Sequence, residues 1–190
     1  MKYLIIYAHP NPKSFNHAIK EVVEDKIRRS GSPFEVRDLY EIKFNPVLSG
    51  SDFVAFKQGQ APEDIKREQG YVKNADMLIF IYPIWWFGMP AILKGYIDRV
   101  FSYGFAYMAD EKGLHGLLTD KKVIIFNTTG GSEEDYAQRG YQDSLKKVTE
   151  IGTFELCGLK VVLHRYFHAV PAVTNEARIK MLEDLKGISL

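Results

Sequence analysis

The chain has 190 residues, of which 46% are hydrophobic, and this length and composition predict one packed domain over residues 1–190. Its 25 Lys and Arg residues stand against 24 Asp and Glu, and the net charge of +1 argues against nucleic acid or an anionic membrane surface as a partner. One Cys excludes an internal disulfide, and no stretch reaches the roughly 20 apolar residues of a membrane span, so we expect a cytoplasmic protein without membrane insertion.

Strands and helices alternate along the chain. Segments rich in Val, Ile, Phe and Tyr predict five strands at residues 3–8, 34–39, 77–83, 122–130 and 159–167. Apolar spacing, Pro and Gly predict helices at 16–29, 62–74, 90–101, 132–151 and 175–186, and residues 40–62 remain one long connection. This alternation predicts an α/β three-layer sandwich with helices on both faces of a five-stranded parallel sheet in the flavodoxin-like order 2-1-3-4-5.

Ligands of such a sheet bind outside the carboxyl ends of its strands, so four loops are of interest. The first, "AHPNPKSFNHAI" at residues 8–19, lacks both G-x-G-x-x-G and G-x-x-x-x-G-K-[ST]. Ser14 and Asn16 open a helix whose unpaired N–H groups suit a phosphate, and His9 is placed to donate to the same group. In the alternative interpretation, Ser14 or Asn16 is only an N-cap and His9 an ordinary loop residue.

The second loop, "YPIWWFGMP", places three large aromatic residues at the end of a buried strand. Neighbouring side chains of an extended segment point to opposite sides, so some of Trp85, Trp86 and Phe87 must leave the core. Rigid aromatic rings beside Gly88, where the backbone can approach closely, favour a slot for a planar ring. The alternative is a surface patch used in dimerisation.

The third and fourth loops are less specific. Gly130 and Gly131 leave the fourth strand together, which exposes backbone N–H groups, and Tyr136 follows as a hydroxyl donor; a plain Gly-Gly turn is the alternative. Residues 102–116 place Tyr107 in an alternation of aromatic and small residues that a packed core edge would also show. The histidines have no metal-ligand grouping, so no metal site is expected. A phosphate site, an aromatic slot and a Gly-Gly rim at one sheet edge together favour a flavin nucleotide.

The chain resembles a known family over nearly its whole length. The stretches "AHPNPKSFNHA", "FNPVLSGSDF", "DIKREQ", "ADMLIFIYPIWWFGMPAILKGYIDRVF" and "TTGGSEEDY" resemble the flavodoxin-like NAD(P)H:quinone oxidoreductases, the DT-diaphorase group with its shorter bacterial relatives. The resemblance implies a homodimeric enzyme that passes a hydride from NAD(P)H through a flavin to quinones with ping-pong kinetics. FAD is the expected cofactor and FMN the alternative. NADH versus NADPH, the physiological acceptor, a nitro- or azoreductase activity, a one-electron carrier and a regulatory subunit of a potassium-efflux system stay open.

The resemblance also implies roles for individual residues. The flavin phosphates would be contacted by His9, Ser14, Phe15, Asn16 and Ala18. The flavin ring edge would lie along Pro83, Ile84, Trp85, Trp86 and Phe87, and the opposite rim would be Thr128, Thr129, Gly130 and Gly131. Tyr136 and Gly130 would be catalytic by stabilising negative charge on the reduced ring. The substrate pocket would use Trp86, Phe87, Tyr107 from the partner subunit, and Gln142, which stands where the animal enzymes have a histidine.

Overall fold

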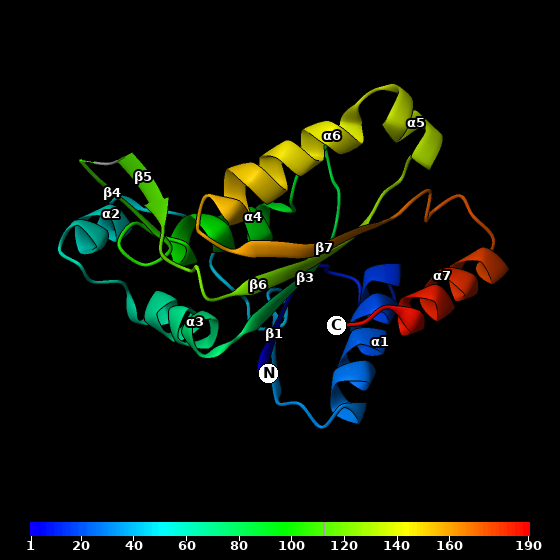
Figure 1. Cartoon of the computed structure of the whole chain (residues 1–190), viewed down its shortest axis with the longest axis horizontal. Coiled ribbons are helices and arrows are strands. Elements are labelled where there is room, and N and C mark those ends of the chain that lie inside the picture. The colour runs from blue at the N-terminus through cyan, green and yellow to red at the C-terminus, as the bar shows by residue number, and fades with distance from the viewer. Residues whose placement is uncertain (112) are drawn as a thin grey trace.

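A computed structural model describes residues 1–111 and 113–190 and contains a five-stranded parallel sheet (Figure 1). Its strands lie in the order β2-β1-β3-β6-β7, which have the bounds Phe34–Asp38, Tyr3–Tyr7, Met77–Pro83, Lys122–Thr128 and Lys160–Phe167. All neighbours in this sheet pair in parallel. The five predicted strand segments are therefore the five strands of the sheet.

The strand order in chain numbering is 2-1-3-6-7 and not the expected 2-1-3-4-5. The difference arises because two further strands, β4 (Tyr107–Asp110) and β5 (Gly113–Gly116), come between the third and fourth strands of the sheet and pair with each other in antiparallel fashion. Each has four residues and is largely exposed, so neither carries the apolar run by which the sheet strands were predicted.

Two helical predictions also need correction. The single helix expected over 132–151 is divided into α5 (Glu133–Gln138), α6 (Tyr141–Lys146) and the π-helix η1 (Lys147–Glu155). Gly140 separates the first two because its φ of +66° is left-handed and cannot continue a helix. The connection expected over 40–62 contains α2 (Gly50–Lys57), whose start is a capping box between Ser49 and Asp52.

The remaining helices complete two layers around the sheet. They are α1 (Phe15–Arg29), α3 (Glu63–Asn74), α4 (Ala91–Val100) and α7 (Asn175–Gly187). One core lies between the sheet and α1 with α7, and the other lies between the sheet and α3, α4, α6 and η1. The central strands are buried on both faces, which explains why β1, β3 and β6 read as continuous apolar runs. Figure 1 shows α1 and α7 side by side on the same side of the sheet.

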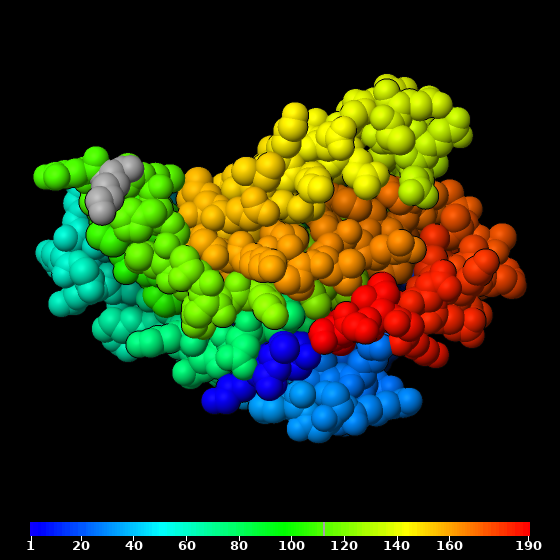
Figure 2. Space-filling model, viewed as in Figure 1, coloured from blue at the N-terminus to red at the C-terminus, as the bar shows by residue number. Residues whose placement is uncertain are grey.

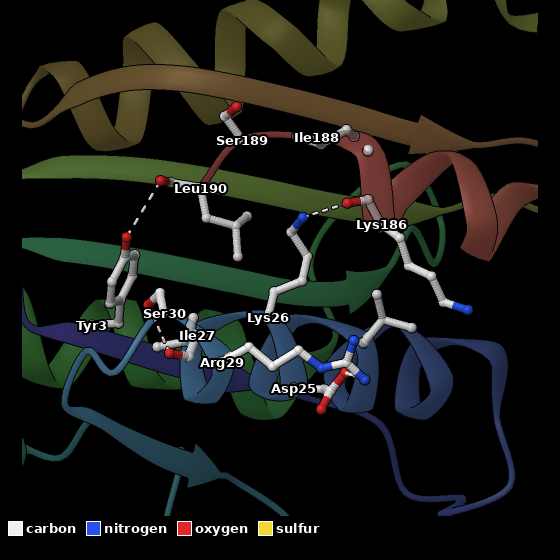
Figure 3. Close-up of a pocket in the computed structure, with 12 residues that line it drawn as sticks. Tyr3, Asp25, Lys26, Ile27, Arg29, Ser30, Lys186, Ile188, Ser189 and Leu190 are labelled. Atoms are coloured by element: carbon white, nitrogen blue, oxygen red, sulfur yellow. Dashed lines mark hydrogen bonds and ion pairs between the residues drawn. The ribbon is translucent and has the colours of Figure 1, made fainter.

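The segment after α7 packs against α1 and the first residue of β1 (Figure 3). Lys26 Nζ donates to the carbonyl of Lys186, and Tyr3 Oη donates to the carbonyl of Leu190 over 3.3 Å. A cavity of about 580 Å³ remains between these elements, at the amino end of β1 and thus away from the carboxyl ends of the strands. Within the described parts of the chain, no helix combines the length and the apolarity needed to cross a bilayer.

Candidate functional site

The loop between β1 and α1 presents hydrogen-bond donors at the carboxyl edge of the sheet. Ser14 is the N-cap of α1, and its Oγ accepts from the His17 amide over 3.1 Å. In residues 1–111 and 113–190, no group accepts from the amides of Phe15 and Asn16, which are the first two of the helix. These amides carry the partial positive charge of the helix start, so they suit an anionic group.

Asn16 joins this helix start to the end of β6. Its Nδ2 donates to Thr128 Oγ1 over 2.8 Å, and both residues are buried. Its Oδ1 is also buried but has no partner among the described residues. A buried acceptor without a donor is unfavourable by about 1–3 kcal/mol. A bound molecule that donates a hydrogen to Asn16 Oδ1 would remove this penalty, so the atom indicates a ligand with hydroxyl or N–H groups.

His9 lies beside the aromatic residues of the second loop. Its ring meets the ring of Trp85 edge-on at 5.6 Å between centroids, and its Nδ1 accepts from the amide of Asn11 over 3.0 Å. Burial lowers the pKa of His9. The ring is therefore neutral near pH 7 and carries its hydrogen on Nε2, where it can donate to a ligand.

A tight turn carries the most exposed aromatic side chain of the loop. Trp85 and Gly88 exchange two backbone hydrogen bonds of 3.1 and 3.0 Å, which leaves Trp86 and Phe87 as the two central residues of the turn. Their φ angles are +50° and +56°, in the left-handed region that turns of this kind normally fill with Asn and Gly. The Trp86 side chain is 99% exposed. Two bulky residues in a strained backbone, with one ring fully in solvent, indicate a functional role rather than a stabilising one.

Phe87 and the third loop together line a cavity of about 360 Å³. Its ring packs on Tyr141 at 4.2 Å between centroids and lies 6.0 Å from the ring of Tyr136. The rings of Phe87, Tyr136 and Tyr141 therefore form one cluster that lines this cavity. Its walls consist of Ile84, Trp86, Phe87, Gly130, Gly131, Asp135, Tyr136, Arg139 and Tyr141.

The Gly-Gly pair forms the rim of the cavity next to Tyr136. A Cβ on Gly131 would come within 3.1 Å of Tyr136 Cε2, so any other residue at 131 would require the Tyr136 ring to shift by a few tenths of an ångström. A Cβ on Gly130 would meet nothing within 4 Å, which leaves the backbone there open to a ligand. The Tyr136 ring is buried, yet its hydroxyl has no hydrogen-bond partner in the described chain. Burial raises the pKa of Tyr136, so the group is a neutral donor at pH 7.

Comparison with known proteins shows what the whole chain is similar to. The family model for the flavodoxin-like fold matches residues 1–187. An uncharacterised NAD(P)H oxidoreductase of Haemophilus influenzae is 40% identical over 184 residues, covering 96% of this chain and 91% of that protein. The human ribosyldihydronicotinamide dehydrogenase [quinone] is 36% identical over 203 residues, covering 95% and 87%. The solved NAD(P)H:quinone oxidoreductase from Methanothermobacter marburgensis has a TM-score of 0.89 at 31% identity, covering 98% and 96%.

The chain belongs to the flavodoxin-like NAD(P)H:quinone oxidoreductase family. The family expected from the sequence motifs is thus confirmed. The roles expected for the individual site residues stay predictions.

Many of the residues expected from the family resemblance lie together. The structure brings Ile84, Trp86, Phe87, Gly130, Gly131 and Tyr136 to one cavity. Trp85 contacts His9, and Thr128 is bonded to Asn16, so the loop between β1 and α1 adjoins this cavity through neighbouring residues. Pro83 ends β3, directly before Ile84, and Thr129 directly precedes the Gly-Gly pair.

Other expected residues lie outside the cavity walls. The Phe15 ring packs on Phe167 at 5.8 Å between centroids, so only the backbone of Phe15 is available to a ligand. Ala18 is half-buried and gives its amide to Ser14 O within the helix. Gln142 is half-buried in the first turn of α6, but its neighbour Tyr141 is the residue that lines the cavity.

Tyr107 lies in a different cavity of about 900 Å³. Its ring stands edge-on to Tyr103 at 5.8 Å, and the apolar walls include Phe53, Ile97, Phe101, Leu114 and Leu156. Within one chain, Tyr107 is therefore separate from the walls around Trp86 and Tyr136. Figure 2 shows the α5–α6 segment (yellow), which carries Tyr136 and Tyr141, as a projection from the body of the molecule.

Sequence reasoning missed Tyr141, Arg139 and Asp135 as residues of the cavity wall. Tyr141 had a detectable signal, because it follows Gly140 in "RGYQ" and a Gly after a short helix marks a sharp change of direction. The expectation of one continuous helix over 132–151 concealed this signal. Arg139 and Asp135 had none, since charged residues near a helix end are ordinarily exposed.

Proposed function

We propose that the chain is a flavin-dependent NAD(P)H:quinone oxidoreductase that carries two electrons from NAD(P)H to a quinone in ping-pong order. The observation that carries the proposal is the strained, exposed Trp86–Phe87 turn opposite the Gly130–Gly131 rim and Tyr136 around one cavity. Rigid aromatic groups on one side and open backbone on the other suit a flat ring system. Relatives that are named NAD(P)H oxidoreductase, ribosyldihydronicotinamide dehydrogenase [quinone] and NAD(P)H:quinone oxidoreductase support the same activity.

The described residues fit a flavin nucleotide at this edge of the sheet. A bound flavin would supply the ring that accepts and releases a hydride. The amides of Phe15 and Asn16 with the Ser14 hydroxyl would hold a phosphate, and Asn16 Oδ1 would accept from a hydroxyl of the nucleotide. We propose FAD as the nucleotide, with FMN as the alternative, because the Ser14-Phe15-Asn16 start resembles that of the animal enzymes.

Tyr136 and the Gly-Gly backbone would stabilise negative charge on the reacting ring. The Tyr136 hydroxyl is neutral near pH 7 and free of partners in the described chain, so it can donate to negative charge that develops on the ligand. The amide of Gly130 has no side chain in front of it, since a Cβ there would meet open space. Trp86 and Phe87 would orient the nicotinamide and then the quinone. Such orientation favours the reaction because the reacting atoms must approach to about 3–3.5 Å.

Isolation of the bound cofactor tests this proposal most directly. The purified protein should be yellow, and the cofactor released by denaturation should have the mass of FAD. Steady-state oxidation of NADH and NADPH with menadione should give parallel double-reciprocal lines, as ping-pong kinetics require. A colourless protein that binds neither FAD nor FMN at micromolar concentration would overturn the proposal. An FMN mass would correct only the nucleotide, and preferred turnover of an azo dye would correct only the acceptor.

We also propose that two copies of the chain associate through the surface around the 900 Å³ cavity. The walls of this cavity are mainly apolar, and Phe53 and Leu114 are each 55% exposed there. Burying such residues stabilises an interface by about 25 cal/mol per Å². The occupant we infer is a second copy, because Tyr107 lies in this cavity while the family resemblance expects it to complete the partner's site.

Sedimentation equilibrium tests the association with a matched pair of variants. Phe53→Asp should shift the protein toward monomer and raise the KM for quinone. Ile179→Asp is the control, because Ile179 is 58% exposed on α7 and does not line this cavity. A monomeric wild-type protein, or equal sedimentation of the two variants, would contradict the proposed interface and leave the flavin proposal standing.

A further inference from the structure

Three rings stack along the outer strand β7 and end at the rim of the candidate site. His164 stacks on Tyr166 at 4.2 Å between centroids, and Tyr166 stacks on His168 at 5.7 Å. His164 is fixed from two sides, since Nε2 lies 2.7 Å from Asn127 Oδ1 and Nδ1 lies 2.9 Å from Glu150 Oε1. The last ring of the stack, His168, follows β7 directly and is half-buried.

His168 contacts both parts of the rim. Its Nδ1 lies 3.1 Å from Thr129 Oγ1, and its ring stands edge-on to Tyr136 at 5.3 Å between centroids. Thr129 Oγ1 in turn donates to the carbonyl of Gly131 over 2.9 Å. The His168 side chain thus contacts Thr129, which is bonded to Gly131, and also contacts Tyr136, the tyrosine that we place at the reacting ring.

Counting hydrogens assigns the tautomer of His168. A threonine hydroxyl has one hydrogen and a carbonyl oxygen only accepts, so both contacts of Thr129 Oγ1 are hydrogen bonds only if its hydrogen goes to Gly131. The contact between Thr129 and His168 is then a hydrogen bond only when Nδ1 of His168 carries a hydrogen and donates it. A neutral His168 therefore has its hydrogen on Nδ1 and its lone pair on Nε2.

The surrounding groups keep this ring neutral near pH 7. Burial lowers the pKa of His168, Glu133 on α5 raises it by a smaller amount, and Arg165 on β7 lowers it. The other titratable groups packed against the ring are Tyr136 and Tyr166, which are neutral because burial raises both of their pKa values. Protonation below neutral pH would thus place a new positive charge beside Tyr136.

We propose that His168 is a positioning residue of the flavin rim, which holds the Thr129–Gly131 turn through its Nδ1 hydrogen and lets pH act on that turn. This inference rests on the proposed function for the identity of the ligand. The hydrogen bond itself belongs to the protein without ligand. Asn places an amide N–H close to where His168 has Nδ1 but does not titrate, so His168→Asn separates the bond from the titration, and His168→Ala removes both.

Nuclear magnetic resonance of the protein without flavin provides the first test. The imidazole ¹⁵N shifts of His168 should report the Nδ1–H tautomer at pH 7. The amide shifts of Thr129 and Gly131 should follow the titration of His168 as the pH falls below 6.5, and this dependence should vanish in His168→Asn. His115→Asn is the control, because His115 lies on β5 outside this stack and its loss should leave the titration of both amides in place.

Binding of FAD and FMN provides the second test. His168→Ala should raise the Kd about tenfold, the equivalent of one hydrogen bond of about 1.4 kcal/mol, while His168→Asn should stay within about threefold of the wild type. An Nε2–H tautomer, amide titrations that persist in His168→Asn, or equal losses of affinity in both variants would overturn the inference. The expected tautomer and titrations in a protein that binds no flavin would uphold the positioning of the turn and overturn the proposed function.

Discussion

The Trp85–Gly88 turn and helix α4 follow each other in the chain but are built in opposite ways. The turn holds two bulky residues at positive φ and leaves Trp86 almost wholly in solvent. Helix α4 buries its Arg99 and packs against a neighbouring loop so closely that it tolerates only glycine at residue 95. Stability is thus concentrated in the helix, and the residues we assign to ligand binding sit on a strained turn that the helix anchors.

Arg99 shows how α4 is anchored. Its guanidinium donates to both carboxylate oxygens of Asp52 over 3.0 and 3.2 Å, to Asp64 Oδ2 over 2.8 Å and to the carbonyl of Asn45 over 2.9 Å. These partners come from α2, α3 and the loop before α2. One buried side chain therefore ties three segments to the helix that supports the aromatic turn. Substitutions in α4 and its contacts should therefore lower stability, whereas substitutions in the Trp85–Gly88 turn should change activity more than stability.

Gly95→Ala should damage the anchor most. A Cβ at residue 95 would stand 2.2 Å from the carbonyl oxygen of Pro46, which is backbone and must move. We expect the free energy of unfolding in urea to fall by about 3 kcal/mol or more. Gly70→Ala in α3 is the control, because a Cβ there meets nothing within 4 Å and should stabilise the helix by about 0.5–1 kcal/mol. Equal effects of the two changes would refute the close approach.

Asp52→Asn should remove the charge that pairs with Arg99. Breaking a buried ion pair on one side destabilises by about 3–5 kcal/mol, and the remaining bond to Asp64 favours the lower end of that range. Asp25→Asn is the control, since its pair with Arg29 is exposed and should change the free energy of unfolding by about 0.5 kcal/mol or less.

The effect of Asp52→Asn should depend on pH. Hydrogen bonds from Arg99 hold the pKa of the Asp52 carboxyl below its ordinary 3.8. Its contribution is therefore fully present above pH 3.8 and is lost as pH falls through the lower pKa of the folded state. The difference in unfolding free energy between wild type and variant should stay constant from pH 7 to 5 and shrink below pH 4. A difference that grows in acid would contradict the pairing.

Trp86→Asn should affect the turn in the opposite sense. Asn accepts positive φ more readily than Trp, and no packing is lost from a fully exposed ring, so the free energy of unfolding should rise by about 1 kcal/mol. The kcat/KM for menadione should fall about tenfold, the equivalent of one lost aromatic contact of about 1.4 kcal/mol. Trp86→Tyr keeps an aromatic ring and should retain most of the activity. Unchanged turnover in Trp86→Asn would show that the strained turn has another purpose.

Tyr136→Phe should have the smallest effect on stability and a large one on rate. The hydroxyl has no partner in the described chain, so the free energy of unfolding should stay within about 0.5 kcal/mol. Loss of a donor to developing charge should slow reduction by NAD(P)H about 100-fold in stopped-flow measurements, with the flavin still bound. Equal reduction rates in the two proteins would exclude this role for Tyr136.

Local sequence determined the sheet, because strands buried on both faces must be continuously apolar. The segments expected at 77–83 and 122–130 became Met77–Pro83 and Lys122–Thr128, two strands that are almost wholly buried. The β4–β5 pair was not predicted, because its short, exposed strands have no continuous apolar run. The helix break at Gly140 was not predicted, because a single glycine also occurs within helices. Only the left-handed φ that the surrounding structure imposes shows that Gly140 separates α5 from α6.

The residues of the candidate site also divide into those that the sequence predicts and those that only the tertiary structure brings there. Trp86, Gly130 and Tyr136 could be named from the sequence, because aromatic residues and paired glycines at strand ends are locally unusual and the topology of a parallel sheet brings such ends together. Tyr141 and His168 enter the site only through packing: the turn at Gly140 directs one toward Phe87, and the last residue of an outer strand places the other against Thr129. Such contacts join residues far apart in the chain, so no local pattern encodes them, and the tertiary structure alone decided them.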